Sequence, residues 1–141
     1  MILYLDTSAL VKLYVEDAHS DLVREAVNQA SLMTSHAIAY AEARAAFRRR
    51  ANDPKYAAAL PQWRVDFEAD WAKIQVLEVT HDLIRRAGDL ADAHNLRGYD
   101  SVHLAAAEAV WQALPGVDFR FAAFDARLMA AAKTLGMRGL E

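Results

Sequence analysis

The hydrophobic positions of this chain fall into short unbroken runs that alternate with longer helical stripes. The run at residues 1–5 is too short for a helix and is typical of a buried central strand. Residues 119–124 form a second strong strand candidate. Weaker patterns predict strands at residues 32–34 and 74–79 and an edge strand at 137–140. Strand candidates are therefore spread along the whole chain.

Helical stripes separate these runs. Helices are expected at residues 8–15, 19–30, 36–51, 56–73, 81–95, 100–114 and 126–135. Helix starts are expected at the capping residues Thr7 or Ser8, Ser35, Thr80 and Asp100. Pro61 should kink or restart the fourth helix, and Gly98 and Gly136 should lie just past two helix ends. Alternating strands and helices predict an α/β fold with a parallel sheet.

Composition narrows the class of protein. The 141 residues are 55% hydrophobic, so we expect one folded domain spanning residues 1–141. There is no membrane-length apolar run, signal peptide or cysteine, which fits a cytoplasmic protein without disulfides or thiolate metal sites. The net charge of -3 means that binding to nucleic acid would need local basic patches or metal ions.

Three aspartates stand where strands end or helices begin. Asp6 and Asp125 each follow a predicted strand, and Asp100 opens a predicted helix. Because the carboxyl ends of parallel strands lie at one edge of a sheet, these carboxylates can meet in one cleft. Each is also a common turn or capping residue, so a purely structural role is the alternative.

Glu42 is the fourth acid, in the second turn of the third predicted helix. It shares a helix face with Ile38, Ala45 and Arg49, which is unusual for a solvated glutamate. From this helix alone, a surface ion pair with Arg49 or Arg44 is the favoured alternative. Arg48, Arg49 and Arg50 suit the end of a helix and can also form a local basic patch.

Other polar and aromatic residues have ordinary structural explanations. His103, three residues after Asp100, is expected to be a hydrogen-bonded packing residue, and Lys12 is expected to pair with Glu16. Asp118 is expected to be only a turn residue. The aromatic stripe with Trp63 and Trp71 is typical of a core or of a partner surface.

Four carboxylates in one cleft would repel one another unless a cation is present. Oxygen ligands without cysteine or histidine suit Mg²⁺ or Mn²⁺. Such a site activates water for hydrolysis of a phosphodiester, with one metal ion or two. The sequence contains no P-loop, dinucleotide-binding glycine motif or Ser–His–Asp order that would point to other chemistry.

At this point the chain resembles a known family, the PIN-domain ribonucleases, and within it the VapC toxins of toxin–antitoxin pairs. Residues 5–14 are similar to the opening motif of the family, and residues 96–105 to the motif around its third acid. Residues 124–128, with Ala131, Ala132 and Gly136 after them, match the fourth motif, and Glu42 stands at the position of the second acid. The order of motifs covers nearly the whole chain.

The resemblance implies a three-layer α/β/α fold with a short, mainly parallel central sheet. It implies Mg²⁺- or Mn²⁺-dependent cleavage of RNA, with Asp6, Asp100 and Asp125 as metal ligands and Glu42 as a ligand or water-orienting acid. It also implies a homodimer and a VapB-type antitoxin, whose C-terminal segment occupies a groove beside the site. The helices around Trp63 and Trp71 could serve either interface. Ala123 departs from the family, which often has Thr or Ser there.

Two other functions remain open from the sequence. A phosphatase could use Asp6 as a covalent nucleophile, but such enzymes commonly carry an acid two residues later, where this chain has Ser8. A PIN-like regulator could bind RNA or a partner without cleaving RNA. Metal-dependent cleavage that is lost in Asp6→Asn would identify the enzyme.

Overall fold

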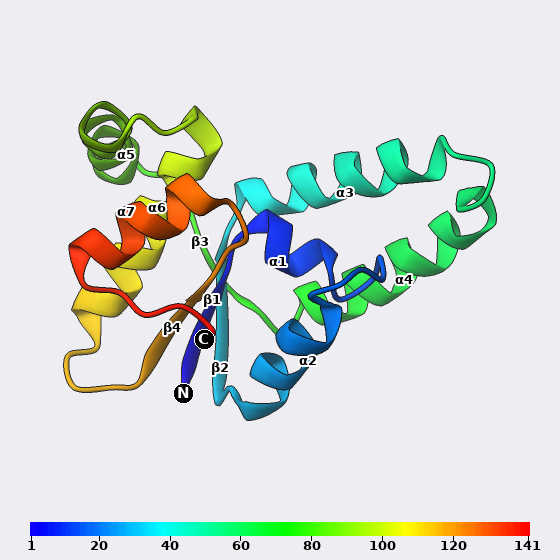
Figure 1. Ribbon diagram of the computed structural model, residues 1–141, viewed down its shortest axis with the longest axis horizontal. Helices are drawn as coiled ribbons and strands as arrows, with labels where there is room; N and C mark the ends of the chain where they lie inside the picture. The colour runs from blue at the N-terminus through cyan, green and yellow to red at the C-terminus, as the bar shows by residue number, and fades with distance from the viewer.

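A sheet of four parallel strands forms the centre of the computed structural model, which describes residues 1–141. The strands are β1 (Ile2–Leu5), β2 (Leu32–His36), β3 (Gln75–Leu77) and β4 (Phe119–Ala122), in the spatial order β3-β2-β1-β4 (Figure 1). The parallel sheet predicted from the sequence is confirmed. From β1 the chain builds the sheet in one direction through β2 and β3, and β4 is then added on the other side of β1. The direction of sheet building therefore changes between β1 and β4. A crevice at such a point is where open α/β sheets bind ligands.

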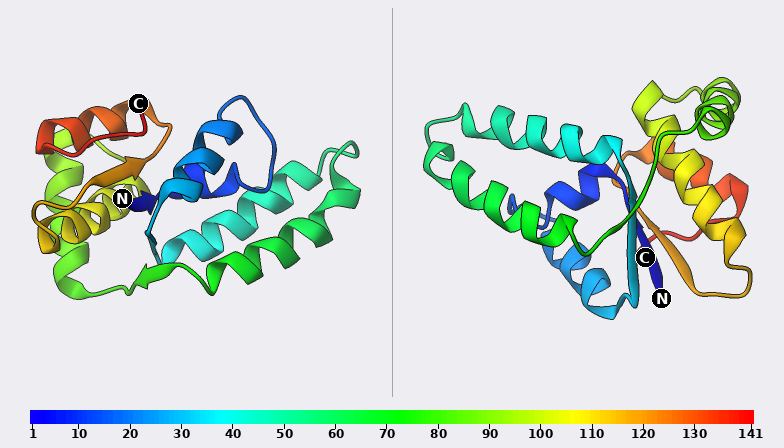
Figure 2. Two further views of the ribbon diagram at one scale, coloured as in Figure 1. Left: turned by 90° about the horizontal axis from the view of Figure 1, so that it is seen from below. Right: turned by 180° about the vertical axis from the view of Figure 1, so that it is seen from behind.

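Helices cover both faces of the sheet, which gives the expected three layers. One face carries α1 (Thr7–Val11), α2 (Ser20–Gln29), α3 (Ile38–Ala51) and α4 (Leu60–Trp71), and the other carries α5 (His81–His94), α6 (Gly98–Ala113) and α7 (Ala126–Leu135). A short 3-10 turn, η1 (Ala57–Ala59), precedes α4, so the chain restarts its helix at Pro61 as predicted. Figures 1 and 2 show α3 and α4 projecting together beyond the sheet. No helix combines the length and the apolar character needed to cross a membrane.

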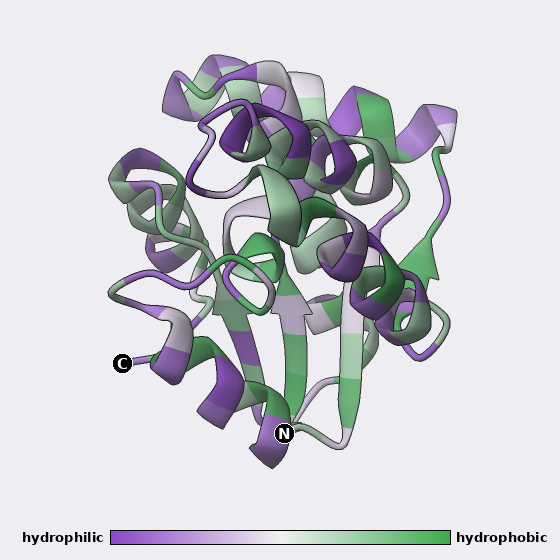
Figure 3. Ribbon diagram, turned by 90° about the vertical axis from the view of Figure 1, so that its right-hand side faces the viewer, coloured by the Kyte–Doolittle hydropathy of each residue, from purple (hydrophilic) through white to green (hydrophobic).

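Alternation along β1 divides the core in two. Ile2 and Tyr4 pack with α5, α6 and α7, whereas Leu3 and Leu5 pack with the helices of the other face. Residues 105–107, three alanines, are at most 2% exposed and let α6 lie close to the sheet. Figure 3 shows the hydrophobic strands between helices whose outer sides are largely hydrophilic.

The aromatic stripe of α4 belongs to the core of this chain. Trp63 and Trp71 are partly buried and pack beside Phe47 and Phe67, with ring centroids 6.0 Å apart for Phe47–Trp63 and 5.6 Å for Phe67–Trp71. Of the two sequence interpretations, packing in the core is confirmed.

Several predicted helix caps are wrong. The cap of α1 is Asp6, not Thr7 or Ser8, because its carboxylate accepts a hydrogen bond from the backbone N–H of Ala9. Ser35 lies inside β2, where its hydroxyl donates to the carbonyl of Leu5. Asp100 lies in the first turn of α6, after the capping position at Arg97.

Two predicted ends also differ. Gly98 is the first residue of α6, and α5 instead ends at Asn95 in the left-handed conformation (φ 53°). Residues 137–140 form no strand, although the carbonyl of Arg138 accepts a hydrogen bond from the N–H of Phe121. Thr80 caps α5 and Gly136 ends α7 in the left-handed region, as predicted.

Candidate active site

The four acids predicted from the sequence line one cleft. Its volume is about 360 Å³, and it lies beyond the carboxyl ends of β1 and β4. Asp6 follows β1, Asp125 caps α7 after β4, Asp100 comes from the start of α6, and Glu42 comes from α3. Basic and hydroxyl side chains complete the lining, among them Thr7, Ser8, Lys12, Arg49, Arg97 and His103. The predicted meeting of the four acids is therefore confirmed.

Asp6 is the most deeply buried acid of the cleft, with 4% of its surface exposed. Its Oδ1 accepts hydrogen bonds from the Ser8 hydroxyl at 2.7 Å and from the Ala9 N–H at 2.9 Å. Burial raises the pKa of Asp6, and His103 and the two hydrogen bonds only partly offset this effect. The neighbours of Asp6 therefore compensate only part of the cost of burying its ionised carboxylate.

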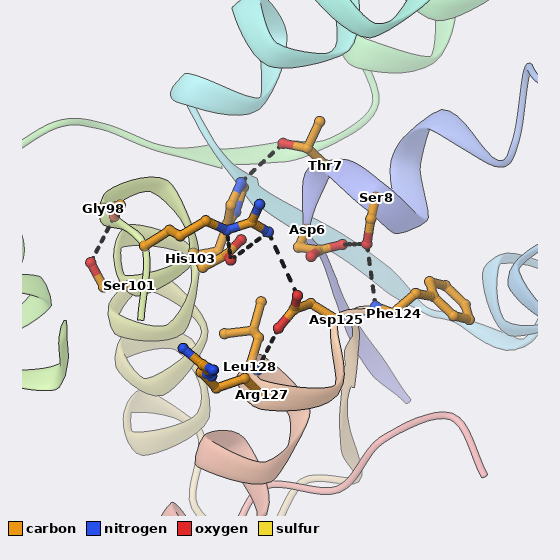
Figure 4. A network of polar contacts seen from close by, with 12 residues as sticks. Asp6, Thr7, Ser8, Gly98, Ser101, His103, Phe124, Asp125, Arg127 and Leu128 are labelled. Atoms are coloured by element: carbon orange, nitrogen blue, oxygen red, sulfur yellow. Dashed lines mark hydrogen bonds and ion pairs between the residues drawn. The ribbon is translucent and has the colours of Figure 1, made fainter. Parts of the chain in front are cut away.

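Ser8 ties the two strand ends together. Its hydroxyl oxygen accepts a hydrogen bond from the Phe124 N–H at 3.2 Å while it donates to Asp6 (Figure 4). Ala123, the position where the family often has a hydroxyl, packs into the core on the α5–α7 face. Ser8 thus provides a hydroxyl link at this corner without a polar residue 123.

Glu42 is held from inside the cleft and forms no ion pair with an arginine. Its Oε1 accepts hydrogen bonds from the Thr7 hydroxyl at 2.6 Å and from His103 Nε2 at 2.9 Å. The alternative of a surface ion pair with Arg49 or Arg44 is wrong, because Arg44 pairs with Glu68 and Arg49 has no acidic partner. Burial favours a higher pKa for Glu42, but the two donors outweigh it and lower the pKa below its ordinary value.

His103 connects Glu42 to the core. The prediction of a hydrogen-bonded packing residue is confirmed, since the ring is 1% exposed and lies 2.8 Å, at Nδ1, from the hydroxyl of Tyr4. Burial raises the pKa of Tyr4 well above its ordinary value, so the phenol keeps its proton and can donate it to Nδ1. Nε2 then carries the ring proton and donates to Glu42. Figure 4 shows the Thr7 hydroxyl joined by a dashed line to the ring of His103, whose Nε2 lies 3.0 Å from Thr7 Oγ1.

Arg97 spans the other two acids. Its Nη2 lies 3.0 Å from Asp100 Oδ2 and 3.6 Å from Asp125 Oδ2, while its side chain is 79% exposed. The bond to Asp100 raises the pKa of Arg97 above its ordinary value. Asp125 also caps α7, because its Oδ1 accepts a hydrogen bond from the N–H of Leu128 at 2.9 Å (Figure 4). An exposed cation therefore lies between two carboxylates.

The oxygen donors of the cleft fit a divalent cation, although no three acidic or histidine side chains lie close enough together in this arrangement to hold one. Asp6 and Glu42 each direct one oxygen to protein donors and leave the other without a protein hydrogen bond. Asp100 and Asp125 already share a cation, the Arg97 guanidinium. Withdrawal of this exposed side chain would free them, and carboxylate oxygens are the ligands that Mg²⁺ and Mn²⁺ prefer.

Sequence reasoning missed two residues that hold these acids in place, Tyr4 behind His103 and Arg97 between the outer carboxylates. Tyr4 precedes Asp6 by two residues, the period of a strand, and Arg97 precedes Asp100 by three, the period of a helix. Both spacings can be read from the sequence, but neither shows that Tyr4 contacts His103 or that Arg97 also reaches Asp125. Lys12 pairs with Asp17 at 2.8 Å rather than with Glu16, and its ammonium also lies 4.7 Å from the centre of the Phe124 ring.

Comparisons with known proteins agree with this geometry. The family model of the PIN domain matches residues 3–134. "Ribonuclease VapC45" from Mycobacterium tuberculosis is 37% identical, over 97% of this chain and 93% of that protein. The structure of M. tuberculosis VapC20, described as a toxin cleaving the Sarcin-Ricin loop, has a TM-score of 0.69 at 19% identity and covers 92% of this chain and 94% of that one. VapBC2 from Rickettsia felis, bound to a promoter DNA fragment, has a TM-score of 0.66 at 12% identity, with 99% and 98% covered. The chain belongs to the PIN-domain family, among the ribonucleases named VapC.

Proposed function

We propose that this chain is the endoribonuclease toxin of a toxin–antitoxin pair and that it hydrolyses RNA with Mg²⁺ or Mn²⁺ held by Asp6, Asp100, Asp125 and Glu42. The observation that carries the proposal is the meeting of these acids, from four separate segments, in one cleft. The ribonuclease names of relatives above 30% identity support the same reaction. A bound divalent cation would lower the pKa of a water molecule and neutralise charge that develops on the phosphate.

The side chains of the cleft prepare this chemistry in different ways. Ser8 and the Ala9 N–H fix Asp6, so the free Oδ2 has a defined position. Glu42 is ionised at neutral pH because its pKa lies below the ordinary value, and its Oε2 is free to orient a water molecule or to accept its proton. Arg49, which lines the cleft and has no acidic partner, supplies positive charge for the RNA backbone.

The partner of the toxin is part of the proposal. Solved complexes of the same fold include VapBC2 and a toxin–antitoxin complex from Klebsiella pneumoniae. We infer that this chain forms a homodimer and binds a VapB-type antitoxin whose C-terminal segment lies in a groove beside the acids.

The decisive experiment is RNA cleavage by the purified chain with Mg²⁺, with Mn²⁺ and with a chelator. Cleavage should require the metal and should be lost in Asp6→Asn, while Asp92→Asn, an exposed acid outside the cleft, should keep it. Binding of RNA without cleavage by the wild-type chain would instead support the non-catalytic regulator. A phospho-aspartyl intermediate on Asp6 would support the phosphatase.

A further inference from the structure

A second groove continues the acidic cleft along α3. Its volume is about 510 Å³, and it lies between α3 and the start of α6. Ile38, Ala41 and Ala45 form its floor, while Tyr99 and Arg49 stand at its border. Thr7, Glu42 and Arg49 line both this groove and the acidic cleft, so the two are continuous. We call it the Tyr99 groove.

Tyr99 lies outside the packed interior of the fold. Its side chain is 63% exposed, although it directly precedes Asp100 in the first turn of α6. It belongs to neither hydrophobic core and lies against no other aromatic ring. An exposed aromatic ring at the border of an active-site groove is a stacking surface for a flat ligand.

Arg49 is exposed and has no carboxylate partner, in contrast to Arg24, Arg44, Arg86, Arg97 and Arg120, which form ion pairs. It follows Glu42 by seven residues on the same face of α3, which is about 10 Å along the helix axis. A free guanidinium at this distance from the acids is suited to a phosphate group. The groove thus offers an aromatic face and an unpaired cation on a floor of small side chains.

We propose that the Tyr99 groove binds a nucleotide of the RNA next to the bond that is cut, with its base on the Tyr99 ring and a backbone phosphate at Arg49. This inference rests on the proposed function, because it places the scissile phosphate at the four acids. The combination of an aromatic platform with an unpaired cation is the recognition chemistry of single-stranded nucleic acid. The small side chains of Ala41 and Ala45 in the lining leave room for a planar base.

The test measures binding of a fluorescently labelled single-stranded RNA of mixed sequence by anisotropy, in a chelator and again with Ca²⁺. Tyr99→Ala should weaken binding about 10-fold, the effect of losing one stacked base. Val117→Ala, an exposed apolar residue far along the chain, is the control and should bind as the wild type does. Arg49→Ala should weaken binding and reduce the salt dependence by about one phosphate contact. Arg48→Ala, its neighbour on another face of α3, should change neither.

Tyr99→Trp supplies a readout that a structural role would not change. It should bind RNA like the wild type, and the emission that it adds to that of Trp63, Trp71 and Trp111 should be quenched by RNA. The proposal is overturned if Tyr99→Ala binds like the wild type, if RNA leaves the added emission unchanged, or if the wild type binds no RNA in either condition. Cleavage that does not depend on Tyr99 would reject only the proposal that the Tyr99 groove binds a nucleotide. Binding that depends on Tyr99, without any cleavage, would reject only the proposal that the chain is a nuclease.

Discussion

The acids of the cleft form two pairs that are held in opposite ways. Asp6 and Glu42, the inner pair, accept hydrogen bonds from neutral or backbone donors that are themselves fixed by the fold. Asp100 and Asp125, the outer pair, share Arg97, whose side chain is 79% exposed. The fold itself therefore positions the inner pair, whereas an exposed side chain holds the outer pair.

Energetics support this division. An exposed ion pair contributes about 0–1 kcal/mol, so withdrawal of Arg97 from the outer pair costs little. Loss of a buried donor costs about 1–3 kcal/mol, because the partner is left without a hydrogen bond. If the proposed metal site is right, a divalent cation would displace Arg97 and leave the Tyr4–His103–Glu42 chain of hydrogen bonds in place.

The largest expected effect is on catalysis by the inner pair. Glu42→Gln keeps the shape of the side chain but removes its charge, and cleavage should fall at least about 100-fold, as when one preorganised charge-stabilising group is lost. Glu25→Gln, an exposed glutamate on α2, is the matched control. Asp6→Ala and Asp100→Ala should likewise abolish toxicity on expression, with circular dichroism unchanged. Full toxicity of these variants would refute the site.

The next effect concerns the residues behind Glu42. Tyr4→Phe leaves His103 Nδ1 without its donor, so the ring can turn its proton away from Glu42, and kcat should fall about 10-fold, as expected for a lost orienting partner. KM should stay the same. Because Glu42 loses a donor that lowers its pKa, the acidic limb of the pH–rate profile should move to higher pH. A change in KM alone would show that Tyr4 serves packing rather than positioning.

A smaller effect, opposite in sign, is expected at the outer pair. Arg97→Ala removes the competing cation, so Mn²⁺ should bind about 3-fold more tightly, within the range of one exposed ion pair. Isothermal titration of the metal-free chain measures this change. Arg127→Ala removes a nearby exposed guanidinium that bonds only a carbonyl, that of Asn95, and should have no effect. Weaker Mn²⁺ binding in Arg97→Ala would contradict a competitive role.

The smallest effect is on stability. Burial raises the pKa of Asp6 above its ordinary value of 3.8. Between the ordinary pKa and the raised pKa, the folded chain therefore binds more protons than the unfolded chain. The free energy of unfolding falls as the pH rises through this range. Asp6→Asn keeps the capping oxygen without the charge, so without metal it should melt about 3 °C higher than the wild type at neutral pH. The difference should grow from about pH 4 upward and then level off. A lower melting temperature at neutral pH would contradict the account.

The sequence predicted features that depend on neighbouring residues better than contacts between residues far apart in the chain. The strand runs and the positions of Asp6 and Asp125 after them are local patterns, and they were enough to predict the parallel sheet and the cleft. The helix pattern could not identify the partner of Glu42, because helix spacing favours Arg49 whereas the actual donor, His103, lies 61 residues away. Caps failed where a nearby side chain had a better partner, as Ser35 does at the Leu5 carbonyl.

The most direct test of the central claim is a crystal soaked with Mn²⁺ and examined by anomalous diffraction. The account predicts a peak about 2.1 Å from Asp6 and from at least one of Asp100 and Asp125, with Arg97 moved away from the outer pair. A map without a peak among these acids, while Arg97 still joins Asp100 and Asp125, would contradict it.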